Sequence, residues 1–386
     1  MHYLSHSQEF RSVHSERLQK LSGIWREITS PAPRDIWQEL LQHDTSALIS
    51  QTPAWLDAIC DTTGAEDASR LYETVDGKRL ILPLVRAKGL PKKFAPVYSL
   101  PHGWGMGGVV SDEPIQKHEA EGIFADLIGA DAVRVTLRPN PLLTNVWEAV
   151  APAQVNKKSR LTQIIDIREG FEHYWANTIR STNRTKVRKA EKSGLVVECD
   201  TTGKRIPDFY QLYMKWMNDR AQQRRLPQWL VQRLGRWREP YRRYESVARR
   251  CGDACRVWTA HLDGVLVAAS ISLIHGKQAT FWRNASDREL TVKTRANDLL
   301  QKCMIEDACN AGCHYYHMGE SGGVASLIQF KRGFGAQEFY YHEYMLESLP
   351  ISRVEEGLHN SFKYIEKLAV SGRNVKQQAA ETPEAE

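Results

Sequence analysis

The sequence predicts an α/β protein built from two tandem domains of similar type, each with a mixed sheet. The length of 386 residues suits two domains. Strands alternate with helices and with short hairpins along the chain, which favours mixed over purely parallel sheets. Each half contains an Asp-Gly pair between two apolar strands, Asp76-Gly77 and Asp263-Gly264, then a helix and a strand. We interpret this repeat as a distant duplication.

Turn and periodicity signals place the elements of the first half. Thr52 can cap a helix, because Pro53 suits a first turn and apolar residues follow at helical spacing. The expected order is a peripheral segment over 1–34, helices over 36–41 and from 53, strands over 70–75 and 79–85, a Gly/Pro-rich loop over 89–108, a helix over 114–128 and a strand over 132–137.

The same signals predict the second half. Gly194 and Gly312 mark the ends of two helices, since glycine favours the left-handed cap. The expected strands cover 161–167, 195–199, 257–262, 265–274, 278–284, 314–318 and 338–346. The expected helices cover 171–192, 207–225, 228–250, 296–311 and 325–331, and residues 349–386 are expected to form a C-terminal helix and a disordered tail.

Composition excludes several classes of protein. Lys and Arg total 52 against 46 Asp and Glu, so the formal charge is only +6. There is no apolar run of 18 residues, and the N-terminus lacks the apolar core of a signal peptide. The seven scattered cysteines then indicate free thiols in a reducing cytoplasm, and they form no zinc-binding pattern.

Two basic segments each allow two interpretations. Arg180, Arg184 and Arg188 are four residues apart, so they line one helix face. That face is either an ordinary solvated surface or a groove that binds the phosphate groups of a substrate or donor, and we give the two interpretations about equal weight. Ten arginines between 214 and 250 alternate with aromatic residues such as Trp216, which suits RNA binding or, more commonly, helices with aromatic residues inside and arginines outside.

Polar residues near the end of the second half are candidates for chemistry. Glu320 follows a predicted strand, where ligands commonly bind, and it is either a general base or a turn residue. Lys331 ends a short helix before Gly333-Phe334-Gly335, where it either stops the helix or faces an oxyanion or phosphate. The sequence contains no Walker, dinucleotide or Gly-x-Ser-x-Gly motif.

Four segments of the second half form a recognisable series. They are the basic stretch from Arg180 to Glu198, Tyr210-x-x-Tyr213-x-x-Trp216 with Arg220, the helix from Ala296, and Gly319-Glu320-Ser321 followed by Phe330-Lys331-x-x-Phe334-Gly335. Taken in this order, they resemble the FemAB-like and cellulose-biosynthesis-associated acetyltransferase domains of the GNAT superfamily. Two short segments of the first half, Thr52-Pro53-Ala54-Trp55 and Leu82-Pro83-Leu84, resemble the N-terminal part of the same family.

The resemblance implies a degenerate GNAT-like domain over 35–158 and a catalytic one over 159–348. It also implies transfer of an acyl or aminoacyl group to an amine without a covalent enzyme intermediate. Lys331 would lie near the reacting groups and stabilise the oxyanion, and Glu320 or a nearby tyrosine, Tyr315 or Tyr316, would accept the proton. The groups that contact a phosphate-bearing substrate would be Arg180, Arg184, Arg188, Trp216 and Arg220.

The donor is expected to be a co-substrate, acyl-coenzyme A or aminoacyl-tRNA, with no permanently bound cofactor. The stretch that corresponds to the family's pyrophosphate loop offers Lys293, Arg295 and Asn297 but no glycine. The acceptor is expected to be an anionic small molecule or a glycan- or lipid-linked compound. Three functions stay open: an N-acyltransferase, an aminoacyl-tRNA-dependent transferase, and a non-catalytic binding protein on the same fold.

Overall fold

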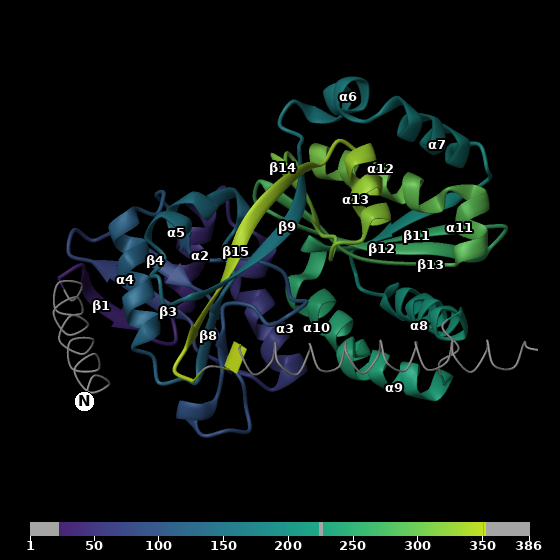
Figure 1. The fold of residues 1–386 in the computed structure, drawn as a ribbon. Helices are drawn as coiled ribbons and strands as arrows, with labels where there is room; N and C mark the ends of the chain where they lie inside the picture. Colours follow the sequence, from purple (N-terminus) through teal and green to yellow (C-terminus); the bar gives the residue numbers. More distant parts are fainter. Residues whose placement is uncertain (1–22, 224–226, 350, 353–386) are drawn as a thin grey trace, which may run out of the picture.

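A computed structural model describes residues 23–223, 227–349 and 351–352. The described strands form two sheets. One has four strands in the order β1-β3-β4-β7, and the other has eleven in the order β10-β11-β12-β13-β14-β9-β15-β8-β6-β5-β2. Helices cover both faces of the large sheet in the second half (Figure 1). The mixed-sheet α/β class predicted from the sequence is confirmed.

The first half holds mostly short strands and four of the longer helices. Its helices are α2 (Arg34–His43), α3 (Pro53–Thr63), α4 (Lys117–Ile128) and α5 (Thr144–Val150), with short helices at Ile49–Gln51, Lys92–Phe94 and Pro141–Leu143. Its strands are β1 (Trp25–Thr29), β2 (Glu66–Asp67), β3 (Arg70–Thr74), β4 (Arg79–Leu82), β5 (Val85–Arg86), β6 (Val97–Tyr98), β7 (Val110–Ser111) and β8 (Arg134–Leu137).

The second half has longer strands. They are β9 (Asn156–Asp166), β10 (Val196–Asp200), β11 (Cys255–Leu262), β12 (Val265–His275), β13 (Gln278–Ser286), β14 (Tyr315–Glu320) and β15 (Gln337–Glu347). The helices are α6 (Gly170–His173), η4 (Tyr174–Thr178), α7 (Ser181–Glu191), α8 (Ile206–Gln223), α9 (Gln228–Arg238), α10 (Tyr241–Cys251), η5 (Gly252–Ala254), α11 (Arg288–Thr294), α12 (Ala296–Asn310) and α13 (Ala325–Gly333).

The pairing of β9 with β15 joins the two halves into one sheet. These strands run antiparallel from Gln337 opposite Ile164 to Met345 opposite Asn156. On one side β9 pairs with β14 of the second half, and on the other side β15 pairs with β8 of the first half. The last strand of the described chain therefore completes the sheet of the first half, and the expected boundary between residues 158 and 159 falls inside β9. The domain limits stay a prediction.

Each half contains one parallel strand pair. In the first half β6 pairs with β8, and in the second half β13 pairs with β14. Parallel neighbours need a long crossover, which α4 provides in the first half and α11 with α12 in the second. The two Asp-Gly hairpins also form, as β3–β4 and β11–β12. This repeated order agrees with the duplication inferred from the sequence.

The prediction of one long helix over 171–192 is wrong. It is divided into α6, η4 and α7, because Ile179 and Arg180 take extended backbone conformations between η4 and α7. The guanidinium of Arg184 donates to three backbone carbonyls at the end of η4, at 2.8 to 3.1 Å. A side chain from the next helix therefore satisfies groups that a helix end leaves unpaired.

Three further expectations need correction. The single helix over 228–250 divides into α9 and α10 at Pro240, which has no backbone N–H and fits the start of a new helix. Residues 25–29, expected to be peripheral, form β1 and pair with β3. The Gly/Pro-rich loop contains β6, whose two residues gave too short a signal. The C-terminal helix and tail expected over 349–386 lie outside the described residues, apart from residues 349, 351 and 352.

One hydrophobic core spans both halves. Trp55 of α3 packs edge-on against Trp282 of β13 at 5.2 Å between ring centroids, and against Trp104 at 5.7 Å. The same cluster contains Tyr244 of α10 and Leu71 of β3. Because large aromatic side chains dominate core burial, this cluster fixes the loop around Trp104 against the second half.

Gly335 ends the Phe330-Lys331-x-x-Phe334-Gly335 segment at a position that favours glycine, and the effect of replacing it on stability can be measured. Its φ is +84°, and an added Cβ would lie 2.8 Å from the carbonyl oxygen of Thr178. We expect Gly335→Ala to lower the unfolding free energy by on the order of 3 kcal/mol in urea denaturation. Gly276→Ala is the control, since Gly276 has φ +51° but nothing near its Cβ position, and should lose only about 1 kcal/mol. Equal losses would contradict the proposed clash.

Candidate active site

The parallel pairing between β13 and β14 stops before either strand ends. Its register covers only Gln278 to Thr280 opposite Tyr315 to His317, although β13 continues to Ser286 and β14 to Glu320. Irregularities in the neighbouring ladders fall close to this point, at Trp282 in β13 and at Met318 in β14. Bulges of this kind bend a strand away from its partner and are common beside functional sites. The free strand ends therefore form the edge of the candidate site.

Lys331 of α13 reaches this edge from a buried position. Its side chain is only 2% exposed, and its Nζ donates to the carbonyl oxygens of Gly319 at 2.7 Å and Glu320 at 3.1 Å. Burial lowers the pKa of Lys331 to about 7, while the charge of Glu320 opposes that shift. An ammonium has three N–H donors, so one donor remains beyond these two carbonyls.

The carboxylate of Glu320 is held by side chains from two other strands. Its Oε1 accepts from Arg138 Nη2 at 2.8 Å and from the Tyr341 hydroxyl at 2.5 Å. Arg138, which follows β8, is buried and also forms an ion pair with Glu343 at 3.5 Å. Arg160 of β9 binds the same Glu343. First-half and second-half residues are thus combined around one carboxylate.

The loop 101–104 of the first half connects this network to a second cluster. Burial and the nearby Arg138, Arg238 and Arg160 lower the pKa of His102. The next carbonyl, of Gly103, accepts from Arg283 Nη2 at 2.8 Å and also from the guanidinium of Arg243. The loop therefore lies between the Glu320 network and the arginines of β13 and α10.

Glu239 balances the charge of this second cluster. It binds Arg243 at 2.8 Å, Arg283 at 3.2 Å and the Tyr244 hydroxyl at 3.0 Å. Burial opposes the ionisation of Glu239, but Arg283 and Arg243 more than offset it and lower the pKa of its carboxyl. Burial and the charge of Arg283 lower the pKa of Arg243 to about 10. The charge of Glu239 therefore stabilises the charges of both arginines, and the arginines stabilise the charge of Glu239.

A pocket of about 630 Å³ opens beside this cluster. Glu239 and Arg283 contribute charge to its lining, and most of its other lining residues are apolar or aromatic. Such a combination is typical of a ligand site, in which a few polar groups orient an apolar body. The remaining lining residues come from α8, α9 and β13: Tyr213, Trp216, Met217, Ala221, Val231, Leu234, Gly235, Arg238 and Asn284.

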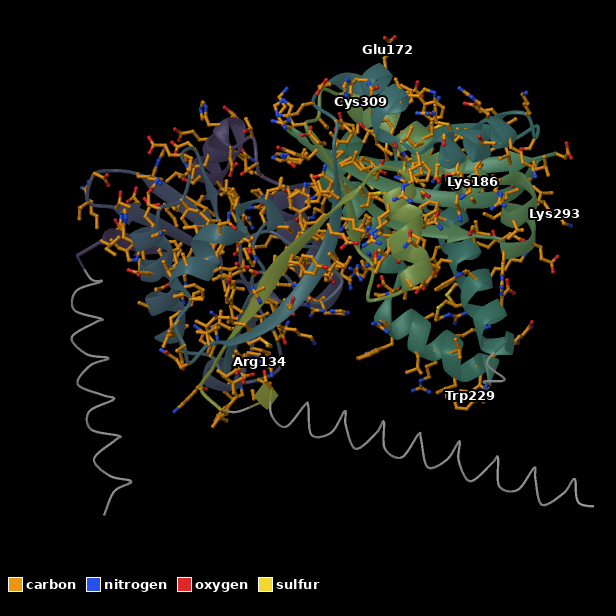
Figure 2. The ribbon with its side chains drawn as sticks, turned by 45° about the horizontal axis from the view of Figure 1, so that its top comes forward. Arg134, Glu172, Lys186, Trp229, Lys293 and Cys309 are labelled. Atoms are coloured by element: carbon orange, nitrogen blue, oxygen red, sulfur yellow. The ribbon has the colours of Figure 1, made fainter. Side chains whose placement is uncertain are left out.

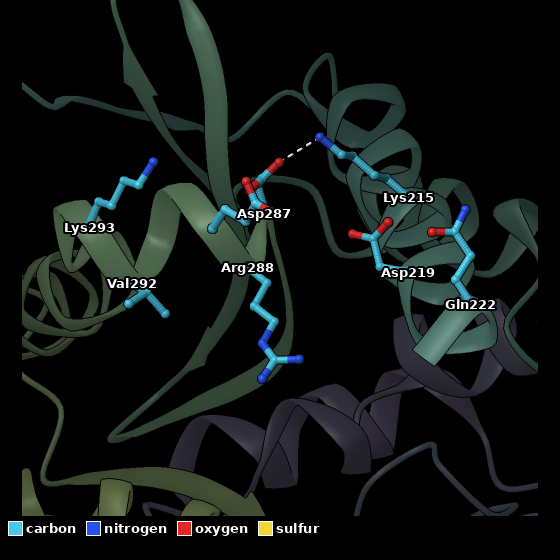
Figure 3. A pocket seen from close by; sticks show the side chains of 8 residues that line it. Lys215, Asp219, Gln222, Asp287, Arg288, Val292 and Lys293 are labelled. Carbon is cyan, nitrogen blue, oxygen red and sulfur yellow. Dashed lines mark hydrogen bonds and ion pairs between the residues drawn. The ribbon is translucent and has the colours of Figure 1, made fainter. Parts of the chain in front are cut away.

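A second pocket, of about 800 Å³, lies between α8 and α11 (Figure 3). It contains Lys293, one of the residues expected to bind the donor, together with Arg288. Lys215 is paired with Asp287 at 2.5 Å across it. Because Asp219 and the Asp287 carboxylate also line this pocket, its charge is mixed rather than strongly positive.

Arg295 and Asn297 lie at the start of α12, next to this second pocket in sequence. Arg295 has φ +62°, a left-handed conformation that glycine adopts more easily. The Asn297 amide donates to Ser286 at 3.3 Å. Their roles and that of Lys293 stay predictions, and the residues present do not form a strongly basic phosphate site.

The expected substrate-binding arginines are not gathered at the reaction edge. Arg180 and Arg188 are exposed on α7, and Arg184 is engaged with the backbone of η4. Helix α7 packs on α12, on the face of the sheet opposite α8 and α9 (Figure 1). Trp216 lines the 630 Å³ pocket and stacks on Tyr213. The side chain of Arg220 lies outside the described residues.

Tyr316 is not placed to accept a proton, which corrects that expectation. Its side chain is fully buried beneath α12, where its hydroxyl accepts from Gln301 at 2.7 Å. Burial raises its pKa well above the usual range, the opposite of what a general base needs. Alternation along β14 directs Tyr316 into the core, whereas Glu320 lies at the strand end.

The described residues offer neither a metal-binding group nor a membrane-spanning helix. Within the described ranges, no three His, Cys, Asp or Glu side chains are grouped so as to hold a metal ion. The cysteines are unpaired thiols, and burial raises the pKa of Cys309 and Cys313 to about 11. No helix of the described chain is long and apolar enough to cross a bilayer.

Comparisons with known proteins agree with this architecture. Residues 177–332 match the family described as acetyltransferase (GNAT) domain. FemX superposes with a TM-score of 0.61 at 13% identity, over 83% of this chain and 97% of its own. The fold is GNAT-like. A conserved protein of unknown function from Bacteroides thetaiotaomicron VPI-5482 superposes with a TM-score of 0.52 at 10% identity, over 81% and 97%. No curated protein sequence matches the chain.

Sequence reasoning missed the residues that link the two halves. Three residues bind Glu320 or Glu343, and they lie at separate places in the sheet: Arg138 just after β8, Arg160 in β9 and Tyr341 in β15. His102 lies in a loop whose glycines and prolines were noticed without a role for its side chain. No local pattern combines residues so far apart in the chain, because the β9–β15 pairing brings them together.

Lys331→Met should change how stability depends on pH. The folded-state pKa of Lys331 is about 7 and its ordinary value is 10.5. Between these values the unfolded chain binds more protons, so the wild type gains stability as pH rises. Relative to Lys331→Met, the wild type should gain on the order of 2 kcal/mol from pH 7 to 9 in urea unfolding. Parallel pH profiles would show that Lys331 does not titrate in this range.

Glu239→Gln tests the buried charge cluster. The change leaves Arg243 and Arg283 without their carboxylate, so we expect a loss of about 3 kcal/mol of unfolding free energy. Glu198→Gln is the control, because Glu198 and its partner Arg205 are both well exposed; it should cost under about 1 kcal/mol. Similar costs for the two variants would mean that Glu239 is not the counter-charge of this cluster.

Proposed function

We propose that the protein is an N-acyltransferase that transfers an acyl group from a thioester donor to the amine of an anionic acceptor. The observation that carries the proposal is the position of Lys331, whose buried Nζ lies at the end of β14, beside the carbonyls of Gly319 and Glu320. The matched GNAT acetyltransferase domain supports the reaction class.

Each proposed step involves a group at this edge. The acceptor amine attacks the donor carbonyl, and the remaining N–H of the Lys331 ammonium stabilises the oxyanion. Glu320 accepts the proton that the amine loses, and the carbon–sulfur bond breaks as the oxyanion collapses, so that the donor sulfur leaves as a thiolate. Arg138 and Tyr341 hold the carboxylate in place and are positioning residues. Oxyanion stabilisation by one donor is typically worth about 3 kcal/mol.

The surrounding charges support an anionic acceptor. In addition to burial, three nearby guanidinium groups, those of Arg138, Arg238 and Arg160, lower the pKa of His102. A fourth arginine, Arg283, lines the adjoining pocket. An acidic glycan, a lipid-linked compound or an anionic small molecule would be attracted to this group of guanidinium ions. We place the acceptor in the 630 Å³ pocket, with its amine directed toward Glu320.

An aminoacyl-tRNA donor is the second candidate. It is favoured by the left-handed Arg295 turn, which lacks the glycines of a coenzyme A loop, and by the exposed Arg233, Arg236 and Arg242. Such a donor should bind with a steep salt dependence. Activity with acyl-coenzyme A alone and a flat salt response would remove it. Binding of an anionic glycan or lipid without turnover of any donor would favour a non-catalytic role.

Lys331→Ala tests the mechanism. We expect kcat to fall roughly 100-fold with an unchanged circular dichroism spectrum, measured by product formation across a panel of acyl-coenzyme A thioesters and charged tRNA. The neighbouring Arg332→Gln is the control, since Arg332 only pairs with Glu338 on the surface, and it should keep full activity.

The pH profile separates the two forms of Lys331. Because the ammonium is the active form in this mechanism, wild-type kcat should fall as pH rises through about 7. The Lys331→Ala variant should lack that decline. A folded, fully active Lys331→Ala protein would exclude the role, and a wild-type kcat that rises through pH 7 would exclude the ammonium as the active form.

A further inference from the structure

Helix α9 exposes an unusual set of large apolar side chains. Trp229 is 67% exposed, Leu230 36%, Leu234 53% and Trp237 81%. Tryptophans are normally among the more buried residues of a folded protein, so two on one surface helix need an explanation. Figures 1 and 2 place α9, with Trp229 at its N-terminal end, at the outer edge of the molecule, away from α6 and α7.

These side chains share one face of the helix with positive charge. At 100° per residue, Leu230, Leu234 and Trp237 fall within one narrow arc, and Arg233 lies between them and Trp229. Arg236 continues the same face. Gly235 points to the opposite side, where it packs on Met217 of α8. This face is therefore both apolar and basic, whereas the opposite face of the helix packs against α8.

Helix α9 carries no acidic residue. Its charged side chains are Arg233, Arg236 and Arg238, all exposed. Glu239, the next residue, is engaged with Arg243 and Arg283 in the buried cluster. An RNA would also attract the arginines, but it would leave the exposed Leu230 and Leu234 in water. A surface that is negatively charged outside and apolar beneath accounts for both properties.

We propose that α9 docks the protein onto an anionic lipid surface. Trp229 and Trp237 insert at the level of the headgroups, the two leucines reach the acyl boundary, and the arginines bind lipid phosphates. Leu234 also lines the 630 Å³ pocket, together with Arg283 and Glu239. Docking by this face brings the pocket opening to the membrane surface, where an amphipathic lipid-linked molecule would be available.

Sedimentation with vesicles tests the docking without any transferase assay. The full chain is mixed with vesicles of phosphatidylcholine alone or with phosphatidylglycerol added. We expect the wild type to bind the anionic vesicles and Trp229→Gln/Trp237→Gln to bind at least about tenfold more weakly. Val75→Gln/Leu90→Gln is the matched control, because both residues are exposed apolar side chains on the first half, and it should bind like the wild type.

The contribution of the α9 arginines to vesicle binding is tested by separate variants. Arg233→Gln/Arg236→Gln should lose about tenfold or more of the binding to anionic vesicles. Lys92→Gln/Lys93→Gln removes the same charge from the first half and should lose much less. All altered residues are exposed, so each variant should keep the wild-type melting temperature.

Several results would overturn the proposal. They are wild-type binding no stronger to anionic vesicles than to phosphatidylcholine, and tryptophan variants that bind as well as the wild type. Wild-type dimers that the tryptophan variants cannot form, without vesicle binding, would assign the face to a second copy of the chain. Binding of tRNA that depends on Arg233 and Arg236, in a protein that ignores vesicles and tolerates Leu230→Ser/Leu234→Ser, would assign it to RNA.

Discussion

The antiparallel pairing of β9 with β15 is the constraint on which the rest of the structure depends. It joins strands from the beginning and the end of the second half, and it extends the sheet into the first half through β8. Tyr341 lies opposite Arg160 in this register, and Glu320 of β14 lies opposite Thr162 of the same β9. The site residues therefore occupy neighbouring rows of one sheet.

Burial of charge at this seam has chemical consequences. Lys331 sits where its ammonium is poorly solvated, so its pKa falls to about 7 and both protonation states are available near neutrality. Glu320 lies close by but is compensated by Arg138. The ion-paired carboxylate of Glu320 and the buried amine of Lys331 therefore lie within one small region.

The loop 101–104 couples the two halves directly. The Gly103 carbonyl binds guanidinium groups from β13 and α10, Trp104 packs under Arg243 at 4.3 Å, and His102 lies among the arginines of the site. The first half therefore supplies part of the site although its own strands are short. Arg283, whose guanidinium binds the Gly103 carbonyl, also lines the 630 Å³ pocket between α8, α9 and β13.

The sequence by itself determined the fold class, the two hairpins and most helix positions, because apolar periodicity, Asp-Gly turns and glycine caps are local signals. It also singled out Lys331 and Glu320, which lie together at one strand end. The interruption at Ile179 has no local breaker residue, whereas the one at Pro240 has a local signal in the proline itself, which suits the start of a helix and not its interior. Only the tertiary structure decided that Tyr316 faces the core and that Arg184 caps a neighbouring helix. It also decided that Arg138, His102 and Arg283 surround the site, because these contacts depend on strand register and on burial between residues far apart in the chain.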